Sequence, residues 1–205
     1  GGPSLAFTSE APACGVTHTG QGRGMLNVDY DNDGDQDLVI FTNDGPLTLY
    51  RNDLSPAGPT SPTHWLRVFL STRGTPGLAP NGYGAHVTAR VGATTINRWI
   101  HGGSNFVSQS ELSAHFGLGA AAVIDELQVT WPNGQLSTWS NVASDRTITL
   151  RSCRSDVNDD GASSVQDLFD FLAGYFTSNA DFNLSGQTTV QDIFDFLAAW
   201  FAGCS

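Results

Sequence analysis

The feature that most constrains this 205-residue chain is a duplicated unit at its C-terminal end. A 12-residue segment that begins at Asp156 recurs 25 residues later at Asp181, and an apolar segment follows each copy. Each copy has oxygen-bearing side chains at positions 1, 3, 5 and 9, a Gly at position 6 and a carboxylate at position 12. A Ca²⁺ ion takes about six to eight oxygen ligands from a tightly turning backbone, including the carbonyl of position 7. The duplication therefore predicts two calcium loops.

The predicted ligands follow from those loop positions. In the first loop they are Asp156, Asn158, Asp160, Ser164 and Asp167, with the carbonyl of Ala162. In the second loop they are Asp181, Asn183, Ser185, Thr189 and Asp192, with the carbonyl of Gln187. Because Ser185 stands where the first loop has a carboxylate, we expect the second site to bind calcium more weakly.

An apolar helix is predicted after each loop. Large apolar residues recur at i, i+3, i+4, i+7 and i+11, which is one helical face, and we expect these faces to cover each other. They are Val165, Leu168, Phe169, Leu172 and Phe176 in the first copy and Val190, Ile193, Phe194, Leu197 and Phe201 in the second. Four further aromatic residues widen the apolar stripe, and they lie either in the core or against a partner: Phe171, Tyr175, Phe196 and Trp200.

Residues 153–205 resemble a dockerin of the variety common in planctomycete-like bacteria. The residues that carry the resemblance are the Asp at position 12 of each loop, together with the single helix that follows. The resemblance implies extracellular docking, typically to a cohesin domain, with recognition by loop positions 10 and 11. Those positions hold Val165, Gln166, Val190 and Gln191. Since both copies carry the same pair, the resemblance implies two equivalent binding faces and binding in two orientations.

Two of the three cysteines, Cys153 and Cys204, bracket this module. If the two helices pack antiparallel, the ends of the segment meet and a disulfide would close it. On the loop-entropy model such a bond stabilises the fold by about 4 kcal/mol, and it requires an oxidising compartment. Cys14 is then either buried and free or bonded to another chain.

A third calcium loop is predicted near the N-terminus, which brings the expected number of Ca²⁺ sites to about three. Five Asp residues lie within nine positions around Gly34, and they would repel one another strongly without a cation. Asp29, Asp31, Asp33 and Asp37 occupy positions 1, 3, 5 and 9, with the carbonyl of Asp35 at position 7. Expected strands at 38–42 and 47–51 follow the loop.

This N-terminal segment resembles an FG-GAP repeat, the calcium-bearing blade of integrin-type β-propellers. A propeller needs about four or more blades around its axis, and residues 1–54 supply one. We therefore expect that the remaining blades have been lost from a processed or excised chain, that the unit packs on the middle domain, or that it completes a sheet in a neighbouring subunit.

The middle of the chain, residues 64–151, follows a Pro-rich segment at 55–63 that we expect to be an extended linker or a long surface loop. Short segments typical of strands alternate here with turns such as Asn81-Gly82, which predicts an antiparallel β-sandwich or barrel. The expected strands are 64–71, 85–91, 94–101, 125–131, 135–139 and 146–151. The whole chain is thus predicted to be mainly β, with a propeller-blade-like hairpin before this domain and a small helical module after it.

Several motifs of the middle segment resemble, in order, those of the ASPIC and UnbV domain. They are His64-Trp-Leu-Arg-Val, Gly84-Ala-His-Val-Thr, Gly102-Gly-Ser, Ser108-Gln, His115-Phe-Gly-Leu-Gly and Val129-Thr-Trp-Pro-Asn-Gly. The resemblance implies a domain that follows FG-GAP repeats near the C-terminus of secreted proteins. It implies an architecture rather than a catalytic activity.

The charge of the chain lies at its two ends: residues 1–54 carry −6, residues 55–152 carry +2 and residues 153–205 carry −7, which sum to the formal −11. A nucleic-acid partner is therefore not expected, because binding phosphate backbones requires clustered cations. Membrane insertion is not expected either, since no apolar run reaches the roughly 18–20 residues of a span. No catalytic motif is present in the sequence, so we expect no enzymatic activity.

Together these features predict a secreted or cell-surface calcium-binding structural or adhesive protein that makes calcium-dependent protein–protein contacts, with a filament subunit as one form of assembly. One alternative is dockerin-mediated anchoring of a secreted protein to a cohesin scaffold. Another is a carbohydrate-binding module, in which exposed indole rings would stack on sugars. The candidate rings are Trp65, Trp99, Trp131 and Trp139.

Overall fold

The computed structural model describes residues 8–53, 63–73 and 75–204, and it divides into two compact units. The first unit is Gly1–Asp53 with Gly103–Glu111, and the second is Leu54–Gly102 with Leu112–Ser205. The predicted linker at 55–63 lies outside the described residues except for its last residue. Across the described ranges, no helix has both the length and the apolar character to cross a membrane.

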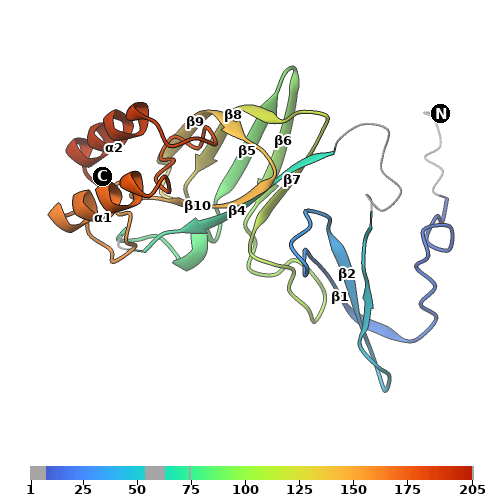
Figure 1. The fold of residues 1–205 in the computed structure, drawn as a ribbon. Coiled ribbons are helices and arrows are strands. Elements are labelled where there is room, and N and C mark those ends of the chain that lie inside the picture. Colours follow the sequence, from blue (N-terminus) through green and yellow to red (C-terminus); the bar gives the residue numbers. More distant parts are fainter. Residues whose placement is uncertain (1–7, 54–62, 74, 205) are drawn as a thin grey trace, which may run out of the picture. The chain divides into compact units, whose positions relative to one another are not determined.

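Two open sheets form the β domain of the second unit (Figure 1). The three-stranded sheet has the order β10-β4-β7, from Arg146–Arg151, His64–Ser71 and Ala114–Gly119. The four-stranded sheet has the order β6-β5-β8-β9, from Thr94–Trp99, His86–Val91, Val123–Thr130 and Leu136–Ala143. A short 3-10 helix, Pro80–Gly82, precedes β5. The mainly β character of the chain is confirmed.

One hydrophobic core joins the inner faces of these two sheets, because alternate residues of each strand point inward. Leu66 and Val68 of β4 lie in this core with Phe116 of β7 and Val87 of β5. Trp131 and Trp139 are also buried in it, so they cannot present their rings to a ligand.

Three expectations about the β domain need correction. The strand β7 was not predicted, although Ala114, Phe116 and Leu118 alternate inward along it. The pairing is not wholly antiparallel, because β10 runs parallel to β4 from Arg146↔Leu66 to Arg151↔Ser71. No closed barrel forms among the described strands, which belong to separate open sheets.

The two predicted helices are present as α1 (Val165–Phe176) and α2 (Val190–Ala202). Each begins with a capping box: Ser164 pairs with Asp167 at the start of α1, and Thr189 pairs with Asp192 at the start of α2. The last carboxylate of each predicted calcium loop is therefore also the third helical residue of the capping box. The predicted Cys153–Cys204 disulfide is present, with 4.8 Å between the Cα atoms.

The expected core face of these helices is wrong. Phe171 and Phe196 make the buried contact, with stacked rings whose centroids are 4.3 Å apart, and Phe182 packs edge-on against both. Six members of the predicted face are instead 56% to 80% exposed: Val165, Phe169, Phe176, Val190, Phe194 and Phe201. The physical reason is that two short helices bury only a narrow seam, and large aromatic rings fill it.

The first unit contains a three-stranded antiparallel sheet of the order β1-β2-β3, from Gly22–Val28, Asp37–Thr42 and Thr48–Tyr50. The segment Gly103–Glu111, which follows β6 in sequence, belongs to this unit and holds the edge of β1. The Ser108 hydroxyl accepts a hydrogen bond from the Met25 N–H and donates one to the Met25 carbonyl, at 3.1 and 2.8 Å. Ser110 contacts Asn27 in a similar way.

Candidate metal centres

The N-terminal loop brings three carboxylates together. Ligand oxygens of Asp29, Asp31 and Asp37 all lie within 4.8 Å of one another, and Asp29 and Asp37 are buried. Asp37 is held in place by the N–H groups of Asn52 at 2.8 Å and Tyr30 at 3.0 Å. Two buried carboxylates beside a third are costly unless a cation neutralises them, so this donor set fits a hard divalent ion.

The pKa of Asp31 is raised, first because it is partly removed from water and then because the carboxylates of Asp33 and Asp37 are near. Asp33 lies outside the trio, and its Oδ1 atom accepts the N–H of Asp35 at 2.9 Å. That Asx-type turn brings the chain past Gly34, whose φ of 94° suits glycine. The structure therefore groups three of the predicted ligands and gives Asp33 a turn-forming contact.

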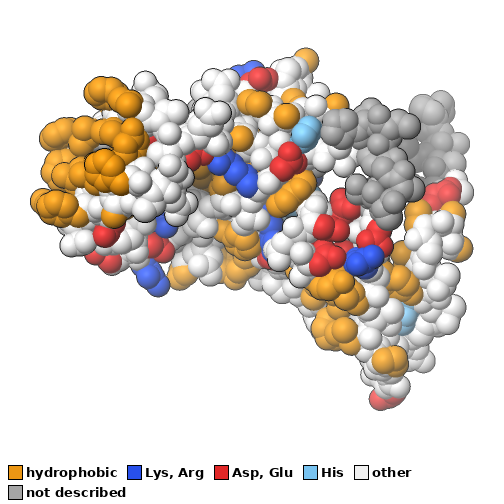
Figure 2. Space-filling model, in the orientation of Figure 1, with side chains coloured by type: hydrophobic (Ala, Val, Ile, Leu, Met, Phe, Trp, Pro, Cys, Tyr) orange, Lys and Arg blue, Asp and Glu red, His pale blue; other side chains and the backbone are white. Residues whose placement is uncertain are grey.

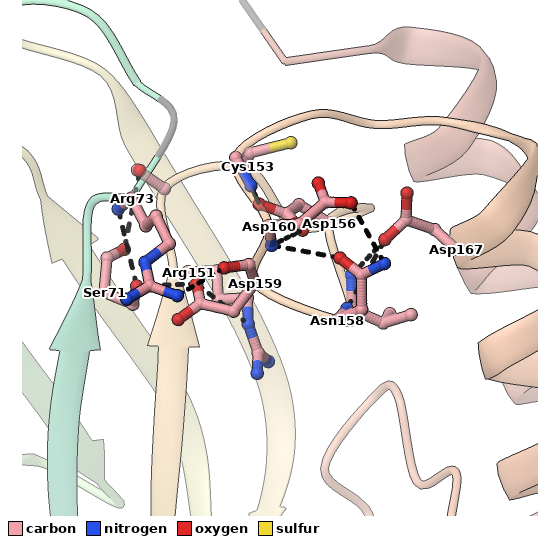
Figure 3. Close-up of polar contacts among 12 residues, drawn as sticks. Ser71, Arg73, Arg151, Cys153, Asp156, Asn158, Asp159, Asp160 and Asp167 are labelled. Carbon is pink, nitrogen blue, oxygen red and sulfur yellow. Dashed lines mark hydrogen bonds and ion pairs between the residues drawn. The ribbon is translucent and has the colours of Figure 1, made fainter.

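The first C-terminal loop closes around the buried side chain of Asp156 (Figure 3). Its oxygens accept hydrogen bonds from the N–H groups of Asp160 at 3.0 Å and Gly161 at 2.9 Å. Burial raises the pKa of Asp156, and the nearby charges of Asp167 and Asp160 add to this effect against the hydrogen bonds. Asp167 accepts the N–H groups of Val157 and Ser164, so it ties the loop to α1.

Asp156, Asp160 and Asp167 do not form a trio of the tightness seen at Asp29, Asp31 and Asp37, which is the one such group among the described residues. The second loop repeats part of this hydrogen-bond pattern. Asp181 accepts the N–H of Gly186 at 2.8 Å, and Asp192 accepts the N–H groups of Asn183 and Thr189. The two loops thus share one backbone design, in which position 12 closes the loop.

Two carboxylates that sequence reasoning missed support these loops. Asp170 accepts a hydrogen bond from the Asn158 amide at 3.2 Å, and Asp195 accepts one from the Asn183 amide at 3.2 Å. Each also accepts the side-chain N–H of a predicted recognition residue, Gln166 or Gln191, at 2.9 Å. The signal was present in the sequence, because an Asp follows position 12 by three residues in both copies.

The exposed apolar side chains of α1 and α2 form a surface that we call the helical face, defined as Val165, Phe169, Phe176, Val190, Phe194 and Phe201. Figure 2 shows hydrophobic side chains gathered over these two helices. Corresponding residues have nearly equal exposure, with Phe169 at 61% and Phe194 at 62%. The duplication therefore produces two matching halves of one apolar surface.

Other predicted features have definite places. Cys14 is exposed and outside the chain's own disulfide, so the first of its two expected states, buried and free, is wrong, and a bond to another chain stays a prediction. Trp99 is exposed and stacks on His86 with 4.0 Å between ring centroids, and Trp65 is half-buried. Of the four tryptophans proposed to contact sugar, only these two have accessible rings.

The comparison with protein families concerns the β domain. Residues 75–156 match the family model described as ASPIC and UnbV. The chain carries an ASPIC and UnbV domain. This domain includes the strands from β5 to β10, and its β6–β7 segment supplies the serines that hold β1.

The chain is also similar to cartilage acidic protein 1 from three vertebrates. It is 33% identical to the Homo sapiens protein over 139 residues, which is 65% of this chain and 19% of that protein. The identity is also 33% to the Mus musculus protein, over 131 residues, and to the Xenopus tropicalis protein, over 127 residues. The chain thus spans about a fifth of the length of these relatives. The resemblances to FG-GAP repeats and dockerins stay predictions.

Proposed function

We propose that this chain is a non-enzymatic, calcium-binding protein that makes calcium-dependent protein–protein contacts in an extracellular assembly. The observation that carries the proposal is the helical face, where six large apolar side chains are exposed on the helices that follow the two predicted calcium loops. An apolar surface of this kind on a small module marks an interaction site. Fully burying a side chain of this size contributes about 1.5–3 kcal/mol, so a protein partner that covers the face gains substantially even after association costs.

Calcium enters the proposal through the helix starts. Asp167 and Asp192 are at once the final loop carboxylates and the capping-box residues of α1 and α2. An ion that holds the loop oxygens together would fix the direction in which each helix leaves its loop. Removing calcium would loosen a loop wherever its acids repel one another, and the helical face would then lose its shape.

An extracellular location is supported by the Cys153–Cys204 disulfide, which persists in oxidising compartments. The similarity to cartilage acidic protein 1 supports the same location. A filament is one assembly that would follow if the helical face of one copy bound a different surface of the next, because heterologous contacts that do not close extend indefinitely.

Sedimentation velocity tests the proposal. The purified full chain should form larger species, by itself or with its partner, in calcium and should return to monomer in excess chelator. The double variant F169D/F194D should stay monomeric in calcium, because it places charge in both halves of the helical face. F106D is the matched control, since Phe106 is at least as accessible as Phe169 and Phe194, at 77% exposed, but lies outside the face. An unchanged monomer in calcium, with an extracellular extract as the source of partner, would refute the proposal.

A dockerin-like role is the second candidate, favoured by the matching halves of the helical face. Such a surface would bind a cohesin-type partner in two orientations. Replacing Val165 and Gln166 alone should leave binding largely intact, whereas replacing Val190 and Gln191 as well should abolish it. Loss of binding when only one of the two pairs is replaced would argue against two equivalent sites.

A carbohydrate-binding role has less support, since it depends on the accessible ring of Trp99 beside His86. Stacking on a sugar would require this ring. A glycan array probed with the full chain and with W99A in the presence of calcium tests the idea. The idea is eliminated if the full chain binds no glycan, or if W99A binds the same glycans equally well.

A further inference from the structure

The β domain contacts both C-terminal loops, but it does so at chemically different positions. In the first loop the contact residue is Asp159, at position 4, which is not a ligand position. The Ser71 hydroxyl donates to its Oδ1 atom at 2.8 Å, the Arg73 guanidinium donates to its carbonyl at 2.9 Å, and Arg151 lies 3.6 Å from the carboxylate. Figure 3 shows these residues on the β-domain side of the loop, apart from Asp156 and Asp167. The cationic groups here therefore neutralise a residue outside the ion site.

In the second loop, a guanidinium from β10 reaches a ligand position directly. The Arg146 Nη1 atom donates to Oδ2 of Asp181, at position 1, across 2.7 Å. Arg146 also donates to the carbonyls of Leu184 and Ala143, and the Ala143 N–H donates to the Leu184 carbonyl at 2.9 Å. Both partners of the ion pair are largely shielded from water, with the Arg146 side chain 25% and the Asp181 side chain 17% exposed. Solvent therefore screens this pair less than an ordinary surface ion pair.

The charge at the two sites differs accordingly. The first loop has carboxylates at positions 1, 5 and 12, from Asp156, Asp160 and Asp167, and across the described part of the chain no arginine pairs with any of them. The second loop has carboxylates only at positions 1 and 12, because Ser185 stands at position 5, and Arg146 pairs with the first of them. The three carboxylates of the first loop have no cationic partner among the described residues and repel one another, whereas Arg146 offsets one of the two carboxylate charges of the second loop.

We propose that Arg146 is a positioning residue that acts as a built-in counter-ion for the second loop, so that this loop keeps its conformation without a metal ion while the first loop needs one. The inference takes from the proposed function only that both segments are cation loops. It is tested in the metal-free monomer, so a failure of calcium-dependent association leaves its test intact.

The two loops contain matched reporters. The Gly161 N–H donates to Asp156 at 2.9 Å, and the Gly186 N–H donates to Asp181 at 2.8 Å, at the same position of each loop. Hydrogen exchange of the full chain in excess chelator, read at these two amides by NMR, should be at least about fivefold slower at Gly186 than at Gly161. Adding calcium should increase the protection of the Gly161 amide more than that of the Gly186 amide. Equal exchange at the two amides in chelator overturns the proposal.

Substitutions separate a counter-ion from a merely structural contact. In R146Q the metal-free exchange at Gly186 should rise to that at Gly161, and added calcium should restore the protection, because the ion supplies the missing charge. R146K should retain part of the protection, since it keeps the charge. R73Q is the matched control, because it removes an arginine contact to the first loop and should leave Gly186 unchanged. Loss of protection in R146Q that calcium does not restore, or no loss at all, contradicts the proposal.

Discussion

Replacing Phe196 with Ala should destabilise the C-terminal module far more than replacing Phe201 with Ala. Phe196 is fully buried and stacks on Phe171 with 4.3 Å between ring centroids, whereas Phe201 is 78% exposed. Deleting a buried Phe side chain costs about 3–5 kcal/mol, because a cavity remains. An exposed substitution changes stability by about 0.5 kcal/mol or less. The expected difference between F196A and F201A is therefore at least about 2.5 kcal/mol.

Native-state hydrogen exchange measures this difference, because the slowest amides of α2 report the free energy of opening the module. Both variants keep the disulfide, so the unfolded state is constrained equally. F201A should instead weaken calcium-dependent association, which sedimentation detects. If F201A lowered the opening free energy more than F196A, the apolar face predicted from spacing would be inside, and the helical face would not exist.

Three further predictions concern other parts of the fold. Burial opposes ionisation of Asp145, but hydrogen bonds from His64 at 2.6 Å, the Trp65 N–H and Ser144 outweigh it and lower the Asp145 pKa. Its stabilisation is thus complete above the ordinary Asp pKa of about 3.9 and is lost as pH falls through the lowered value, so urea midpoints should show that D145N destabilises the chain near neutral pH and not in strong acid. C204S should lower the free energy of unfolding by about 4 kcal/mol, because it removes the disulfide that constrains the unfolded chain between two residues 51 positions apart. Equal exchange protection of α2 in C204S and wild type would contradict this. S108A should speed exchange of the Met25 amide by removing a hydrogen bond worth about 0.5–1.5 kcal/mol, whereas S140A, at an exposed site on β9, should not.

The turns of the two C-terminal loops and the helices that follow them were predictable because their chemistry is local. Oxygen spacing around Gly161 and Gly186 fixes the turn, and the residue at position 12 both closes the loop and caps the helix. The buried face was not predictable, since α1 has large apolar residues almost all round. A periodicity of 3.6 then selects no unique face, and the stacking of Phe171 on Phe196 decides it.

Long-range features could not be predicted from the sequence for related reasons. Alternation along β10 predicts a strand but carries no direction, so its parallel pairing with β4 stayed hidden. The glycines at 117 and 119 weakened the strand pattern of β7. From sequence, Ser108 and Ser110 are expected to be turn residues, because nothing local shows that their hydroxyls hydrogen-bond to backbone N–H groups 83 residues away. The pairing of Arg146 with Asp181, 35 residues apart, is of the same kind.

Calcium binding itself is the central claim, and titration calorimetry of the demetallated full chain tests it most directly. We predict saturable binding at about three sites. D156N should remove one site, and D37N should remove another. Absence of saturable calcium binding, or a stoichiometry that neither substitution changes, would contradict the account.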